Sequence, residues 1–95
     1  MPPRKKQLEW ANVARDEFLE GLMQIADESP ANAALVQSRI EKSLNLLRSQ
    51  PLMGKPGVVA GTRDHAVPNT PFSLIYEDRP TSLFILHCWH QRRDR

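Results

Sequence analysis

The chain has 95 residues, of which 40% are hydrophobic and 25% are charged, and its formal net charge at pH 7 is +2. This length suits one compact domain and is too short for two, and the low net charge excludes an intrinsically disordered chain. The single cysteine, Cys88, excludes an internal disulfide framework and a Cys-rich zinc site, and it fits a reducing cytosol.

The ends of the chain carry basic residues, but the sequence predicts neither a membrane span nor a leader. It contains no run of about 18 apolar residues, and acidic residues from Glu9 onward replace the apolar stretch that a signal peptide needs. We therefore expect a cytoplasmic protein with no membrane partner, in which residues 1–4 form a flexible N-terminus. The basic tail, residues 92–95, is compatible with phosphate binding, although such tails are commonly only solvated.

The first half of the chain has the periodicity of a strand followed by two helices. Residues 5–10 alternate loosely, with Leu8 and Trp10 on one face, which predicts a short strand. Residues 11–26 repeat apolar side chains at spacings of three and four, which predicts an amphipathic helix. Ser29-Pro30 is typical of a helix start, so we expect a second helix from there to just before Pro51.

The second half has the character of a connector followed by strands. Residues 51–61 hold three of the four glycines and predict a turn-rich connector. Three strands are predicted after it, over residues 62–67, 72–77 and 82–90. In the last of these, strict alternation places His87 on the same face as Leu83 and Ile85. The order β-α-α-β-β-β predicts an α+β domain over residues 1–95, with a helical hairpin packed on a twisted, mainly antiparallel sheet.

Several segments in this order carry a resemblance to a known family. They include Trp10 with Ala14, Ser29-Pro30, the run from Pro51 to Gly57, Gly61-Thr62-Arg63-Asp64, the run from Val67 to Phe72, and His90-Gln91-Arg92-Arg93. In this order and at these spacings the chain resembles the RelE/ParE toxins of bacterial type II toxin–antitoxin modules. The resemblance implies a toxin that inhibits growth and that a cognate antitoxin neutralises. It also implies that toxin and antitoxin belong to a module of the kind that stabilises plasmids. Contact with operator DNA would come only through that antitoxin.

The resemblance leaves the target open, because RelE-like members cleave mRNA on the ribosome and ParE-like members inhibit DNA gyrase. RelE-like nucleases resemble one another in a strand arginine, an arginine near the C-terminus, and a terminal aromatic residue or a histidine. Here Ser73 stands at the strand position, and a hydroxyl does not replace the charged fork that arginine offers a phosphate. Arg92 matches the second arginine, but the chain ends at Arg95 without an aromatic residue.

The histidines are the remaining candidates for acid–base chemistry. In an extended strand His87 and Trp89 share one face while Cys88 and His90 share the other, so the two histidines point apart. The alternatives give neither histidine a catalytic role: His87 would pack partly inward, and His90 would lie at a strand end. We expect His65 to lie at the surface. A metal site at Cys88 and His90 lacks further ligands, so no metal and no cofactor is predicted.

Arg63 is the main candidate outside the C-terminus, since the family resemblance places an arginine there. The alternative is a structural role, in which Arg63 beside Asp64 orders the turn or pairs with an acid on the helices. Trp10 and Trp89 fit core or interface positions better than nucleotide stacking. A ParE-like gyrase inhibitor without an active site is therefore the preferred interpretation. Its target or antitoxin contacts would be the surface of the helical hairpin together with Arg63, Trp89, His90, Arg92 and Arg93. The alternatives are a ribosome-dependent mRNA endonuclease using Arg63, His87, His90 and Arg92, and an inactive antitoxin-binding member.

Overall fold

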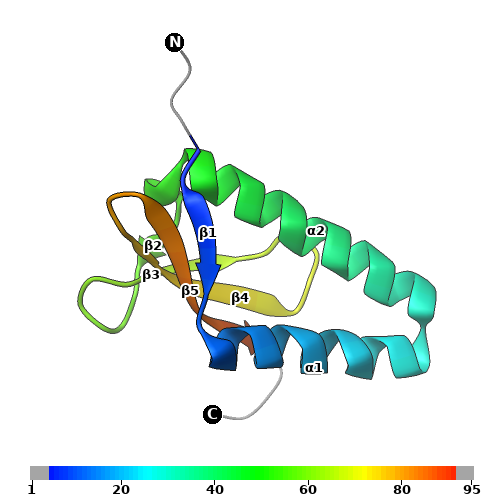
Figure 1. Ribbon diagram of the computed structural model, residues 1–95. Coiled ribbons are helices and arrows are strands. Elements are labelled where there is room, and N and C mark those ends of the chain that lie inside the picture. The colour runs from blue at the N-terminus through cyan, green and yellow to red at the C-terminus, as the bar shows by residue number, and fades with distance from the viewer. Residues whose placement is uncertain (1–4, 92–95) are drawn as a thin grey trace.

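The computed structural model describes residues 5–91, which form two helices packed on a five-stranded sheet (Figure 1). The elements in chain order are β1 (Gln7–Trp10), α1 (Asn12–Glu28), α2 (Pro30–Ser49), the short 3-10 turn η1 (Pro51–Met53), β2 (Lys55–Pro56), β3 (Arg63–Ala66), β4 (Phe72–Asp78) and β5 (Ser82–His90). The predicted α+β architecture is confirmed. The two-residue strand β2 was not predicted, because two residues within a turn-rich connector carry no alternation to read.

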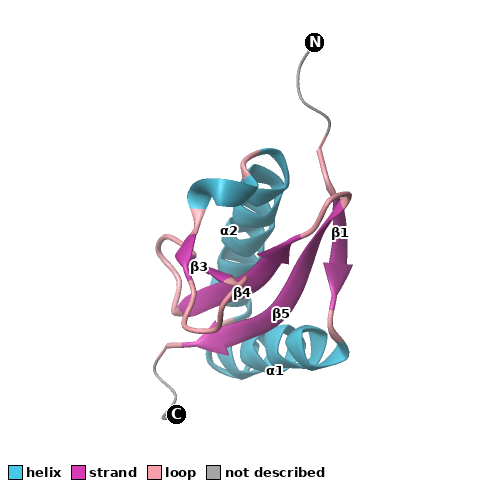
Figure 2. Ribbon diagram, turned by 90° about the vertical axis from the view of Figure 1, so that its left-hand side faces the viewer, coloured by secondary structure: helices cyan, strands magenta, loops and turns pink. Residues whose placement is uncertain are grey.

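The strands follow the order β1-β5-β4-β3-β2 across the sheet. β1 runs parallel to β5, whereas the other neighbouring pairs are antiparallel, so the sheet is mainly antiparallel as predicted. Figure 2 looks onto the sheet from the side opposite α2, and neither of the helices within residues 5–91 lies in front of β4 and β5. We call this side of the sheet the open face and the side toward the helices the covered face.

One serine joins the two helices. The backbone N–H of Ser29 donates to the carbonyl of Ile25 at the end of α1, and its Oγ accepts from the backbone N–H of Asn32 at the start of α2, at 3.1 Å. Pro30 follows at the first helical position, where a missing N–H removes no intrahelical bond. The predicted restart at Ser29-Pro30 is therefore confirmed.

The core lies between the covered face of the sheet and the two helices. Its fully buried side chains from the strands are Phe72, Leu74, Tyr76, Leu83, Ile85 and Cys88. α1 approaches β4 closely at Gly21, where an added Cβ would lie 2.5 Å from ring atoms of Phe72. Glycine at this position thus lets a large aromatic ring fill the space beneath the helix.

A β-bulge in β5 corrects the predicted strand faces. Ile75 pairs with His87 while Tyr76 pairs with Ile85, which leaves Leu86 opposite no residue of β4 in the described sheet. One extra residue moves every later side chain to the other face of the sheet. The prediction that His87 shares a face with Leu83 and Ile85 is therefore wrong; His87 is half-buried on the opposite face. Cys88, 1% exposed, continues the covered face instead.

Candidate functional site

Three side chains form a cluster at the second half of β5: His87 and Trp89 of this strand and Glu17 of α1. β1 pairs with β5 only as far as Ile85, so within residues 5–91 no strand lies beside the later part of β5 on that side, and we call this border its free edge. Glu17 on α1 reaches this edge, where its Oε1 accepts from the backbone N–H of Cys88 at 3.0 Å and lies 3.3 Å from Nδ1 of His87. The carboxylate thus satisfies a strand donor that β1 does not reach.

Trp89 completes this cluster on the open face. Its ring lies 4.7 Å from the imidazole of His87, centroid to centroid, with 31° between the planes. The predicted shared face of His87 and Trp89 is confirmed, and Trp89 is 38% exposed. A histidine oriented at Nδ1 by a carboxylate can exchange a proton at its other nitrogen, and an exposed indole can stack on a planar ligand or pack in an interface.

The thiol next to this cluster is not reactive. Burial, with a contribution from the Glu17 carboxylate, raises the pKa of Cys88 to about 12. Since the thiolate is the nucleophilic form, Cys88 stays protonated and inert near neutral pH. Cys88 accordingly belongs to the core.

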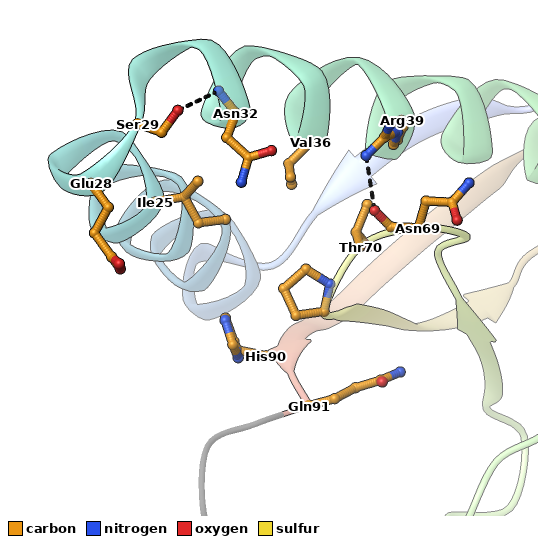
Figure 3. A pocket seen from close by; sticks show the side chains of 11 residues that line it. Ile25, Glu28, Ser29, Asn32, Val36, Arg39, Asn69, Thr70, His90 and Gln91 are labelled. Atoms are coloured by element: carbon orange, nitrogen blue, oxygen red, sulfur yellow. Dashed lines mark hydrogen bonds between the residues drawn. The ribbon is translucent and has the colours of Figure 1, made fainter.

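His90 lies on the other side of β5, at a pocket of about 610 Å³ shown in Figure 3. The pocket is bounded by the turn between α1 and α2, by the β3–β4 turn and by the end of β5. Its lining residues are Ile25, Glu28, Ser29, Asn32, Val36, Arg39, Asn69, Thr70, Pro71, His90 and Gln91. The His90 ring packs edge-on against Phe72, with centroids 5.2 Å apart. The two histidines therefore point to opposite sides of the strand, as predicted.

The pocket has an apolar floor and a polar rim. Val36, which is 3% exposed, contributes to the floor. At the rim Arg39 donates through Nη1 to the carbonyl of Asn69 at 3.0 Å, which joins α2 to the β3–β4 turn. Eight of the eleven lining residues are polar or charged, so the pocket offers mainly hydrogen-bonding groups, with apolar contacts from Ile25, Val36 and Pro71.

Arg63 lies far from this end of β5, at the junction of β3 with the connector. Its Nη1 donates to the carbonyl of Gly54 at 2.8 Å and to that of Leu52 at 3.4 Å. Tyr76 binds the same segment, because its hydroxyl donates to the carbonyl of Pro51 at 2.6 Å and accepts from the N–H of Gly54 at 3.0 Å. In the described structure Arg63 therefore orders the segment from η1 to β2, which lies apart from it in the sequence.

His65 corrects a further prediction. It was expected at the surface, but it is half-buried on β3 with its Nε2 3.2 Å from the Oγ of Ser43 on α2. Burial lowers the pKa of His65 below its ordinary value, and the charge of Asp64 partly opposes this shift. Sequence alternation alone did not reveal which side of β3 faces α2.

The candidate residues are thus distributed over separate surfaces. His87 and Trp89 come together on the open face, His90 lines the pocket, and Arg63 holds the connector; Arg92 and Arg93 lie outside the described residues. Glu17 was missed, because a helical acid 70 residues from His87 gives no sequence signal. Ser73, at the strand position of the family arginine, is buried and its Oγ accepts from Nε2 of Gln91 at 2.7 Å.

Metal binding and membrane insertion are not indicated within residues 5–91. That part of the chain brings no three His, Cys, Asp or Glu side chains into a group that could hold a metal ion. None of the helices described there is long and apolar enough to cross a membrane.

Two comparisons with known proteins agree with this architecture. Residues 8–95 match the family model described as the ParE toxin of the type II toxin–antitoxin system parDE. A solved structure described as the chromosomal ParDE TA system from P. aeruginosa superposes with a TM-score of 0.79 and 19% sequence identity, covering 90% of this chain and 96% of that chain. At that identity the similarity shows a shared fold. No curated protein matches the sequence.

Proposed function

Because this chain belongs to the ParE toxin family of type II toxin–antitoxin systems, we propose that it is a toxin that inhibits DNA gyrase and is neutralised by a cognate antitoxin. Inhibition would occur by binding, without chemistry on the toxin itself. Such a function requires an exposed, complementary surface and no assembled set of acid, base and phosphate-binding groups.

The observation that supports binding over RNA cleavage is the position of Arg63. Cleavage by a 2′-hydroxyl needs cationic groups around the phosphate and an acid–base pair beside it. The Arg63 guanidinium instead donates to the carbonyls of Gly54 and Leu52. His87 lies on the open face and His90 in the pocket, so these three candidates do not converge on one phosphate.

We expect the antitoxin to use the edge of β1, the helical hairpin, or both. The backbone N–H groups of Gln7 and Ala11 donate to the carbonyls of Thr81, just before β5, and of Ile85 in β5. The alternating positions Leu8 and Trp10 therefore direct their backbone groups to the outer edge. An extended segment can add a strand there. An acidic segment of the antitoxin would also meet Arg39 at the pocket rim and the basic tail, residues 92–95. Binding to promoter DNA would be a property of the antitoxin.

Induction of the toxin without antitoxin tests the proposal. We expect growth arrest, loss of plasmid supercoiling or gyrase-dependent DNA breaks, and intact ribosome-associated mRNA. Growth arrest with cleaved mRNA and normal gyrase activity would overturn the gyrase target. Absence of arrest would instead indicate an inactive member that only binds its antitoxin.

The cluster of Glu17, His87 and Trp89 supports ribosome-dependent mRNA cleavage as the second candidate function. The carboxylate orients the imidazole, and the indole beside it offers a surface for a base. In that case His87→Ala should abolish mRNA cleavage while antitoxin binding persists. If the chain inhibits gyrase instead, neither the original chain nor the His87→Ala variant should cleave mRNA.

A further inference from the structure

The loop between β2 and β3 presents an apolar tip to solvent. We call its residues Val58, Val59 and Ala60 the prong; Figure 1 shows this loop projecting from the body of the molecule beyond β2 and β3. Val58 is 104% exposed and Val59 is 67% exposed, while Ala60 is also exposed. Two neighbouring valines at such exposure do not contribute to the core, so their apolar surface is unused within the described fold.

The prong is held in one shape by hydrogen bonds at its base. The N–H of Gly57 donates to the carbonyl of Thr62 at 2.8 Å, and Thr62 donates to the carbonyl of Val59 through its N–H at 3.1 Å and its Oγ1 at 2.6 Å. A Cβ on Gly57 would lie 2.2 Å from Oγ1 of Thr62, so glycine permits this closure. Gly61 has a φ of 86°, a conformation that suits glycine.

The segment before the prong is fixed as well. Arg63 and Tyr76 together bind the backbone of Pro51, Leu52 and Gly54, as described above. Leu52 and Met53 in this segment are 66% and 41% exposed and add apolar surface on the same connector. A preformed loop loses little conformational entropy when it binds, which favours a role in recognition.

We propose that the prong is the surface through which this toxin engages its protein target, by inserting into an apolar pocket of a folded protein. The inference rests on the proposed function insofar as the toxin acts by binding a protein. A projecting, convex tip requires a concave receiver, which a folded domain offers and a short extended antitoxin segment does not. Residues 57–62 carry no charged side chain, so the tip lacks the cations that nucleic acid or an anionic membrane would attract.

The test compares two double variants of the full chain. Val58→Ser with Val59→Ser removes the apolar tip, and Leu19→Ser with Met23→Ser removes comparable exposed apolar surface on α1, where the residues are 49% and 67% exposed. Binding to purified gyrase and to the antitoxin, and growth arrest, are measured for each. We expect the prong variant to lose about tenfold or more in gyrase affinity and in inhibition. The reason is that burial of two valine side chains in the complex stabilises it by at least the free energy that corresponds to a roughly tenfold change in affinity.

A third variant separates shape from apolar character. Gly57→Ala keeps both valines but distorts the base of the prong against Thr62, so we expect it also to weaken gyrase binding. Antitoxin affinity should stay within about twofold of the original value for every prong variant. Circular dichroism and a denaturation midpoint confirm that each variant is folded.

The outcomes distinguish failure of the inference from failure of the proposed target. Three results would overturn the inference while gyrase remains the target. They are unchanged gyrase binding in the prong variants, loss of antitoxin binding in the prong variants, and loss of gyrase binding in the α1 variant alone. If the toxin arrests growth without binding gyrase, and the prong variants abolish arrest, the inference stands and the target differs. Prong-dependent binding to anionic phospholipid vesicles overturns the protein-pocket interpretation, and a chain that neither arrests growth nor binds gyrase overturns both proposals.

Discussion

The covered and open faces of the sheet differ in what their side chains do. On the covered face, Phe72, Leu74 and Tyr76 of β4 are all 0% exposed and pack beneath the helices. On the open face the same part of the sheet presents His87 and Trp89, and Trp89 is 38% exposed. On β5 the open face therefore keeps side chains accessible for recognition, whereas Ser73 and Ile75 of β4 on the same face are only 9% exposed.

The comparison shows how a small domain keeps surface for partners. Most of the fully buried side chains of the strands lie on the covered face, whereas β5 on the open face and the prong carry exposed side chains. Where the covered face ends, at the free edge of β5, a single carboxylate from α1 takes over hydrogen bonding from β1. Substitutions on the two sides should consequently differ in size of effect and in kind.

The largest contrast should come from truncating one aromatic residue on each face. Phe72→Ala removes a fully buried ring under Gly21 and should lower the free energy of unfolding by about 3–5 kcal/mol. Trp89→Ala on the open face should cost less than about 1 kcal/mol. Urea denaturation measures both, and equal losses would show that the open face is part of the stabilising core.

Glu17→Ala tests whether α1 replaces β1 at the edge of β5. The substitution leaves the partly buried N–H of Cys88 without its carboxylate partner, which should cost about 1–3 kcal/mol in the free energy of unfolding. Asp16→Ala, at the neighbouring exposed position, is the matched control and should change stability by less than about 0.5 kcal/mol. Faster hydrogen exchange of the Cys88 amide should accompany the loss only in the Glu17 variant.

Cys88 makes the covered face sensitive to alkali. Its pKa is raised to about 12 in the folded chain from an ordinary value of 9.0, so its contribution to stability is complete below pH 9. As the pH rises from 9 toward 12, the unfolded chain loses the proton first and stability falls. Cys88→Ala should flatten this decline in denaturation measured against pH. A thiol reagent at pH 8 should modify the unfolded chain much faster than the folded chain.

The smallest effect should appear at His65, where β3 meets α2. Because burial lowers its pKa, the neutral form is favoured in the folded chain, and stability should decrease as the pH falls below the ordinary value of 6.5. His65→Gln keeps a polar partner for Ser43 and should remove this acid dependence. A proton NMR titration reporting a pKa at or above 6.5 would contradict the burial seen at this position.

Local patterns in the sequence predicted most of the fold. Spacings of three and four gave α1 and α2, Ser29-Pro30 placed the break between them, and alternation placed β3, β4 and β5. The same patterns missed β2, which is too short to show a period, and the bulge at Leu86, which depends on how β5 registers against β4. The error at His87 followed directly from that missed bulge.

The candidate site was less accessible from the sequence for a related reason. The types of residue were identified, but Glu17, His87 and Trp89 meet only because α1 passes the free edge of β5. The partners of Arg63 are backbone carbonyls of Leu52 and Gly54, groups that every residue carries and no sequence pattern marks. The sequence placed Val58 and Val59 in a turn-rich connector, but their exposure depends on how that loop projects from the sheet.

The sequence by itself determined the two helices, the longer strands and the α+β class, because these depend on short-range periodicity, capping and the order of segments. The family followed from the resemblance of ordered motifs. Only the tertiary structure decided which faces are covered, where the histidines point and what Arg63 binds. Those properties depend on strand register, on one unpaired residue in β5 and on the path of α1. They are set by packing between residues far apart in the chain, which local propensity does not encode.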